Sequence, residues 1–182
     1  MRQHIKLVES TIQAEDIKQA PLGFDTNELW PIMSNHCVDV HYNKLTTKYF
    51  TKYAETGDLF QKAGAILHND YWWPLLQPYE KSNKAPDDVM DLINASHGSF
   101  KSFQKSVKEV AMGIQGNGWV LVLQDLQLQP IQNHVLKPGI AMAIDFWEHA
   151  TVDWDFDREG YLEHFWQIVN WTQFGDNLKG AL

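Results

Sequence analysis

Hydrophobic residues recur at helical spacing in two runs near the start of the chain, and a polar turn separates the runs. The first run covers residues 34–54, the polar segment covers 55–58, and the second run extends from about residue 59 to 72. This pattern predicts an antiparallel helical hairpin. His41 and His68 would then face each other at similar heights, either as a metal-binding pair or as two hydrogen-bonded interior histidines.

The second half of the chain changes from helical to strand patterns and back. The predicted order is two helices, a three-stranded antiparallel sheet and a last helix, which is typical of an α+β fold. The predicted helices cover about 86–98, 99–115 and 158–174, and the predicted strands cover 119–124, 126–132 and 140–144. The chain therefore divides into an N-terminal arm (1–20), a helical-hairpin domain (21–80) and a C-terminal α/β domain (81–182).

Composition narrows the class of protein. The chain has 182 residues, is 44% hydrophobic and contains eight Trp, so it is long and apolar enough for a compact globular core. Its net charge of -8 disfavours nucleic-acid binding, and it has no apolar run of membrane-spanning length. The single Cys37 excludes an internal disulfide, and the first residues do not resemble a secretory signal. We therefore expect a cytoplasmic protein.

The segment 145–149 carries the clearest candidate chemistry. Asp145 and His149 are four residues apart and follow a strongly apolar strand, so both side chains can reach one point if the segment turns helically. A buried carboxylate is costly unless it is paired or bound to a metal, and a simple Asp–His hydrogen bond is the alternative. With His41 and His68, the set of three imidazoles and one carboxylate suits manganese, iron or zinc.

Several motifs make the chain resemble the iron/manganese superoxide dismutase family over roughly residues 22–180. They are His41-Tyr42-Asn43-Lys44 with Tyr49 eight residues after the histidine, His68-Asn69-Asp70-Tyr71-Trp72, Asp145-Phe146-Trp147-Glu148-His149, and the ending Gly160-Tyr161-Leu162-Glu163-His164-Phe165-Trp166. The resemblance implies disproportionation of superoxide to oxygen and hydrogen peroxide. It also implies one Mn or Fe ion per subunit, held by His41, His68, Asp145 and His149.

The resemblance implies further roles around that ion. Tyr49 would relay protons, and Lys44 and Arg158 would attract the superoxide anion through a funnel. Glu148 would bridge to His149 of a second subunit in a homodimer. Three tryptophans would form an apolar wall, although such aromatics are more often ordinary core; they are Trp72, Trp119 and Trp147.

One position bears on the choice of metal. Iron-type members carry a Gln four residues before the second histidine, where this chain has Gly64, as in manganese-type members. Manganese-type members supply the amide from the second strand. The resemblance therefore points to Gln132 in this role, with His134 as the alternative, and favours Mn over Fe.

The chain also departs from the family. Leu45 and Val152 replace a His and a Tyr that normally bond to each other across the dimer interface, and we expect these two apolar residues to pack together instead. The hairpin is short, which argues against a tetramer.

The loss of the His and Tyr pair makes a catalytically weak or silent metal-binding relative one alternative. The other is an oxygen-activating iron enzyme with two His and one carboxylate, which a fourth ligand disfavours.

Overall fold

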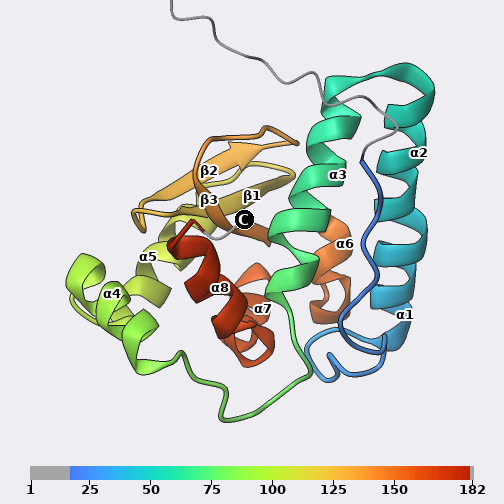
Figure 1. The fold of residues 1–182 in the computed structure, drawn as a ribbon. Helices are drawn as coiled ribbons and strands as arrows, with labels where there is room; N and C mark the ends of the chain where they lie inside the picture. Colours follow the sequence, from blue (N-terminus) through green and yellow to red (C-terminus); the bar gives the residue numbers. More distant parts are fainter. Residues whose placement is uncertain (1–16, 181–182) are drawn as a thin grey trace, which may run out of the picture.

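The computed structural model describes residues 17–180, and most of the expected N-terminal arm lies outside this range. Residues 17–20 run in extended form along the hairpin, where Gln19 donates to the carbonyl of Tyr42. In Figure 1 the hairpin of α2 and α3 stands on one side of the molecule, and the sheet with α4, α5, α7 and α8 forms the other.

The first arm of the hairpin is one continuous helix with a wide turn in its middle. It comprises α1 (Asn35–Asp39), a π-helical segment (Val40–Thr46) and α2 (Thr47–Thr56). Ser34 caps its start, because its side chain accepts a hydrogen bond from the backbone N–H of Cys37. The predicted helix is confirmed, but periodicity did not reveal the π turn, which carries His41.

A tight turn joins this arm to α3 (Leu59–Tyr71). Gly57 ends α2 in the left-handed region at φ +67°, which glycine adopts without strain. Asp58 then caps α3 by accepting from the N–H of Phe60. The antiparallel hairpin predicted from the sequence is therefore present.

The C-terminal half contains the predicted sheet and the two predicted helices that precede it. Its elements are α4 (Asp87–His97), α5 (Phe100–Met112), β1 (Gly118–Leu123), β2 (Leu128–Gln132), β3 (Ile140–Asp145), α6 (Glu148–Thr151), α7 (Arg158–Phe165) and α8 (Trp171–Leu178). Short 3-10 turns cover Trp73–Leu75, Val152–Trp154 and Trp166–Ile168. The sheet is antiparallel in the order β2-β1-β3, so the α+β class is confirmed.

The prediction of one last helix over residues 158–174 is wrong, because the chain leaves the helix between α7 and α8. Val169 is extended and pairs with Leu76 in an isolated antiparallel bridge. Its carbonyl also accepts from the Asn83 side chain at 2.8 Å. Asn170 then caps α8 by accepting from the N–H of Gln173. These tertiary bonds outweigh the helical preference of the local sequence.

The hairpin and the sheet share one core, and the site lies where they meet. Every residue of β3 is buried, and this strand packs against both α3 and α8. Its last residue, Asp145, therefore points into the contact between the sheet and the hairpin. No helix within residues 17–180 has the length and apolar character needed to cross a bilayer.

Candidate metal centre

Four side chains from separate parts of the chain converge at this contact. One ligand atom from each of His41, His68, Asp145 and His149 lies within 4.8 Å of the others. Oδ2 of Asp145 is 3.3 Å from Nε2 of His41, 3.7 Å from that of His68 and 3.3 Å from that of His149. The sequence-predicted ligand set is thus brought together without an omission.

The tautomer of His68, that is, which ring nitrogen carries the proton, is fixed by its backbone partner. Its Nδ1 lies 2.7 Å from the carbonyl oxygen of Gly64, one helical turn earlier in α3. A carbonyl can only accept, so Nδ1 carries the proton and Nε2 presents its lone pair to the other ligands. Burial lowers the pKa of His68 well below its ordinary value, which keeps the imidazole neutral.

Asp145 divides its two oxygens between the chain and the cluster. Oδ1 accepts from the backbone N–H of Trp147 at 2.8 Å, which leaves Oδ2 for the imidazoles. Burial by itself would raise the pKa of this carboxyl, but His149 and His41 together hold it well below its usual range. Asp145 is therefore a buried anion, which a positive charge such as a bound metal ion would stabilise.

His41 is braced from behind by two residues. Thr46 Oγ1 donates to the His41 carbonyl at 2.9 Å and accepts from the indole N–H of Trp73 at 3.0 Å. The Trp73 ring also packs edge-on against His41, with ring centroids 4.8 Å apart. Burial, followed by the charge of His149, lowers the pKa of His41 to about 4. Sequence reasoning missed Trp73, which only its place after Trp72 could have suggested.

The donor set fits a first-row transition metal. Burial keeps His41 and His68 neutral, and a neutral imidazole is the form that binds a metal. A carboxylate oxygen completes the set. Manganese and iron both accept three imidazole nitrogens with one carboxylate oxygen, so the chemistry of the donors does not choose between them.

The assignment of Gln132 to this site is wrong. Its side chain is exposed and donates to the carbonyl of Gln115 at 3.1 Å on the outer side of the sheet. The cause is strand alternation, since Ile131 points inward and the next residue must point outward. The chain then turns at Asn133, which has φ +60°, and brings His134 back inside.

His134, the alternative residue, is buried among the aromatic rings beside the four candidate ligands. Its ring is 4.7 Å from that of Tyr49 and stacks on Trp147 at 4.6 Å. The indole N–H of Trp119 donates to Nδ1 at 3.2 Å, so the proton of the neutral ring lies on Nε2. Within the described chain this Nε2 is buried and has no partner. Burial lowers the pKa of His134 to about 4, so it is a neutral donor.

The aromatic residues predicted around the site are present. Tyr49 stacks on His68 at 5.2 Å, and burial followed by the charge of Asp145 raises the pKa of its phenol. The three predicted tryptophans surround the ligands, with centroid distances of 4.9 Å for Trp119–His68, 5.9 Å for Trp147–His149 and 6.3 Å for Trp72–His41. These rings limit the access of water to the cluster.

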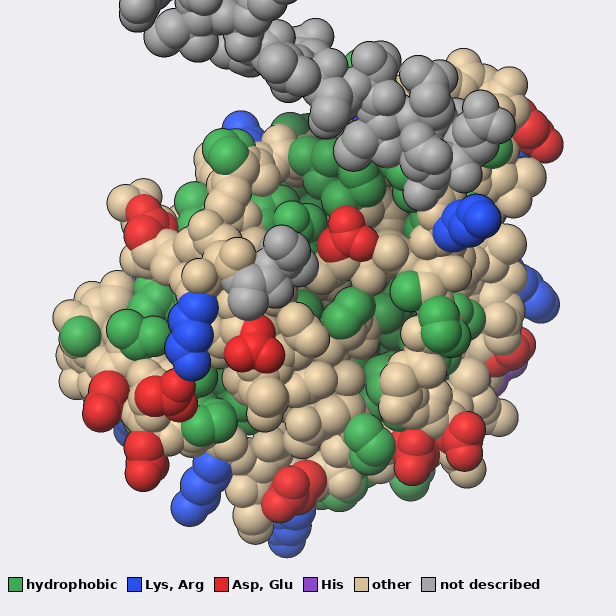
Figure 2. All heavy atoms as spheres, in the orientation of Figure 1, with side chains coloured by type: hydrophobic (Ala, Val, Ile, Leu, Met, Phe, Trp, Pro, Cys, Tyr) green, Lys and Arg blue, Asp and Glu red, His purple; other side chains and the backbone are tan. Residues whose placement is uncertain are grey.

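The charged residues expected around the site behave differently from one another. Lys44 and Glu148 are exposed, whereas Arg158 is half-buried and donates to backbone carbonyls. On the face in Figure 2, basic and acidic side chains are scattered and do not form one basic patch. Arg158 therefore does not present its guanidinium freely to solvent.

A cavity of about 280 Å³ leads to the cluster from the surface. His41 and His149 form part of its wall, together with Glu148, Val152 and Phe156. His149 is the most accessible of the four candidate ligands, with 21% of its side chain exposed, whereas Asp145 is fully buried. Val152 and Phe156 are 45% and 60% exposed, which makes the rim of this cavity apolar.

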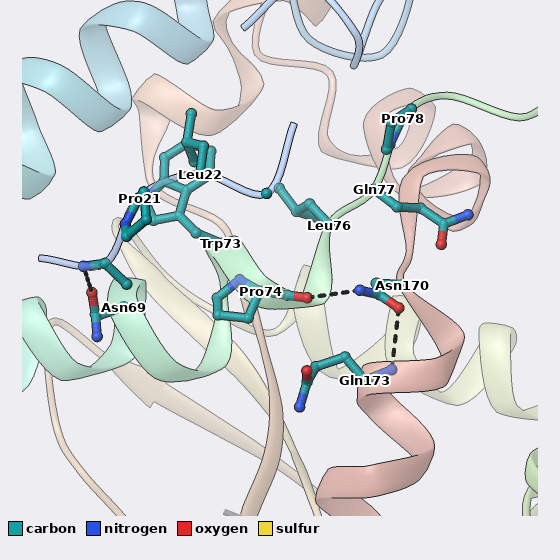
Figure 3. Close-up of a pocket in the computed structure, with 12 residues that line it drawn as sticks. Pro21, Leu22, Asn69, Trp73, Pro74, Leu76, Gln77, Pro78, Asn170 and Gln173 are labelled. Atoms are coloured by element: carbon teal, nitrogen blue, oxygen red, sulfur yellow. Dashed lines mark hydrogen bonds between the residues drawn. The ribbon is translucent and has the colours of Figure 1, made fainter. Parts of the chain in front are cut away.

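Another cavity, of about 310 Å³, lies between the 20–23 segment, the end of α3 and α8 (Figure 3). Its polar side chains are neutral amides that largely bond to the chain itself. Asn69 accepts from the N–H of Ala20, and Asn170 donates to the carbonyl of Pro74. This cavity has no titratable side chain and none of the four candidate ligands in its wall, although Trp73, which packs against His41, lines it.

Comparison with known proteins agrees with this geometry. The sequence model described as "Iron/manganese superoxide dismutases, C-terminal domain" matches residues 85–177, just over half of the chain. The chain belongs to the iron/manganese superoxide dismutase family. The match contains Asp145 and His149, and the fold supplies His41 and His68 from the hairpin.

Relatives in this family extend over most of the chain. A protein named superoxide dismutase [Fe] from Pyrobaculum aerophilum is 28% identical over 89% of this chain and 92% of its own length. One of the same name from Saccharolobus solfataricus is 27% identical over 94% and 97%, respectively. A superoxide dismutase [Mn/Fe] from Aeropyrum pernix is 31% identical over 68% of this chain and 62% of its own length.

Proposed function

We propose that this protein is a superoxide dismutase that converts two superoxide ions and two protons into oxygen and hydrogen peroxide. The observation that carries this proposal is the convergence of His41, His68, Asp145 and His149 within 4.8 Å, in a chain of this family. These four side chains would hold one iron or manganese ion. Such an ion, when bound, supplies the redox chemistry, since it can exchange one electron with each of two superoxide ions.

The other residues of the site control charge and protons. Asp145 contributes one negative charge, which would favour the higher oxidation state of a bound ion. His134 presents an N–H donor from Nε2, and Tyr49 packs against both His134 and His68. We assign to His134 the hydrogen-bonding role that an amide has in other members, and to Tyr49 the relay of protons.

The proposal also includes a choice between manganese and iron. Gly64 supports our preference for manganese, because iron-type members have a Gln at this place. The names of the relatives, which specify Fe or Mn/Fe, support iron. With Gln132 outside the site, the second-strand amide no longer argues for manganese. Reconstitution with each metal is the decisive comparison.

We also propose a homodimer in the cytoplasm. The apolar rim around Val152 and Phe156 is exposed, as a subunit interface would be in a single chain. Glu148 lies at this rim and would reach His149 of the second subunit, while Leu45 would pack against Val152. Val152→Asp should give a monomer by light scattering, and a persistent dimer would place the interface elsewhere.

The function is tested by stopped-flow measurement of superoxide decay on protein reconstituted separately with Mn and with Fe. We expect one bound ion per chain and decay faster than free metal in at least one form. His149→Ala serves as the control with an incomplete ligand set. If the wild type binds metal but neither form exceeds free metal, the silent-relative alternative takes precedence. The replacement of two polar residues by Leu45 and Val152 is the observation that favours it.

A further inference from the structure

Arg158 is the first residue of α7, and its guanidinium donates to three backbone carbonyls. Nη1 donates to the carbonyl of Ile114 at 3.0 Å, and Nη2 donates to the carbonyls of Gly116 and Phe146, the latter at 3.1 Å. A cation at a helix N-terminus is disfavoured by the helix dipole, so these bonds must offset that cost. These hydrogen bonds therefore explain why a cation stands at the start of this helix.

One of these contacts leads directly to a candidate metal ligand. The carbonyl of Phe146 and the N–H of Trp147 belong to the same planar peptide group. Arg158 donates to the carbonyl end of this group, and the N–H end donates to Oδ1 of Asp145 at 2.8 Å. A single rigid unit thus connects the guanidinium to the buried carboxylate.

The preceding peptide group is held as well. The N–H of Phe146 donates to the carbonyl of Gly118, the first residue of β1, at 3.0 Å, so Phe146 is held by β1 on its N–H side and by Arg158 on its carbonyl side. The cap of α7 fixes the other end of the connection, because Asp157 Oδ1 accepts from the N–H groups of Glu159 and Gly160 at 3.1 Å. Little freedom is left to the peptide group between Phe146 and Trp147.

We propose that Arg158 is a positioning residue that acts on Asp145 through this peptide group. A charged donor on the carbonyl polarises the peptide and strengthens its N–H as a donor. Oδ1 of Asp145 is thereby held on the backbone, and Oδ2 is aimed at the imidazoles. The inference rests on the proposed metal site and replaces the expected role of Arg158 in a substrate funnel.

Metal binding tests this inference without superoxide. The dissociation constant of Mn(II) is measured by chelator competition for the wild type, Arg158→Gln and Arg158→Lys. Lys108→Gln is the matched control, because Lys108 lies on α5 and pairs with Glu159 and Glu163 of α7, whereas within residues 17–180 it donates to no carbonyl beside the ligands. We expect about tenfold weaker binding in Arg158→Gln, since loss of such an outer support typically costs tenfold or more. Arg158→Lys should fall between it and the wild type, and the control should match the wild type.

The direction of the change separates the alternatives. A positive charge acting only at a distance would repel the cation, so its removal would tighten Mn(II) binding. A purely structural arginine would lower the melting temperature and leave the dissociation constant unchanged. Either result overturns the proposal, and Arg158→Lys carries the test if Arg158→Gln does not fold. A wild type that binds Mn(II) without dismutating superoxide would refute the proposed function alone.

Discussion

Gly64 lies against the rings of Tyr49 and His134. The single methyl group added by Gly64→Ala therefore tests how tightly the site is packed. A Cβ at residue 64 would lie 2.9 Å from Cδ1 of Tyr49 and 3.1 Å from Cδ2 of His134, well inside normal carbon contacts. Neither ring can yield freely. Tyr49 stacks on His68, and His134 is held by Trp119.

The expected stability change of Gly64→Ala follows from two opposed terms. Replacing a glycine inside a helix by alanine gains about 1 kcal/mol of helix preference. Overpacking costs about 1–3 kcal/mol, because both rings must shift. We therefore expect a loss of unfolding free energy between about zero and 2 kcal/mol, together with reduced dismutase activity.

A double-mutant cycle separates the clash from the helix term. Unfolding free energies are measured by denaturant titration of the metal-depleted wild type, Gly64→Ala, His134→Ala and the double variant. In the His134→Ala background one of the two obstructing rings is gone, so Gly64→Ala should cost less or should stabilise the chain. A Gly64→Ala protein that is about 1 kcal/mol more stable than the wild type and fully active would refute the claim of a tightly packed site.

Three further predictions follow from the ligands and their supports. His149→Ala should lose its bound metal by elemental analysis, and retention of one tightly bound ion would mean that the ligand set is wrong. Because burial lowers the pKa of His134 to about 4, the unfolded chain binds more protons between about pH 6.5 and 4. The contribution of neutral His134 to the unfolding free energy is present above that range and is lost as the pH falls, by about 3 kcal/mol in total. His134→Gln should therefore flatten the pH profile of the unfolding free energy. Thr46→Val should cost about 1–3 kcal/mol, because it leaves the buried indole N–H of Trp73 unpaired, whereas Val at the exposed Thr47 should change little in the same denaturant titration.

The sequence was most informative where hydrophobic spacing and short motifs agreed. The hairpin, the three strands and the four converging ligands were all predicted, because His41 and His68 lie within helically patterned runs and Asp145 and His149 come at the end of a strongly apolar strand. The second half of the predicted last helix failed at Val169, where a bridge to Leu76 far away in the chain decides the backbone. Local periodicity contains no information on such a partner.

The polar residue beside the four ligands, His134 instead of Gln132, was harder to predict. Gln132 has the expected side chain, but its place in the strand alternation turns it outward. His134 reaches the site only because Asn133 adopts a positive φ that reverses the chain. A positive φ at a residue other than glycine is uncommon, so a pattern of residue types did not reveal it. The role of Arg158 was likewise hidden, since basic charge alone suggests solvent or substrate rather than carbonyl partners.

The π turn at Val40–Thr46 explains a spacing that a regular helix would not tolerate. Eight residues of α-helix rotate by about 800°, which would leave His41 and Tyr49 about 80° apart around the axis. A turn that absorbs one additional residue reduces this to about seven helical steps, or about 700°, and brings the two within about 20°. The interval of eight residues between His41 and Tyr49 is thus explained by one inserted residue, and its deletion would leave about seven regular helical steps with both side chains still on one face.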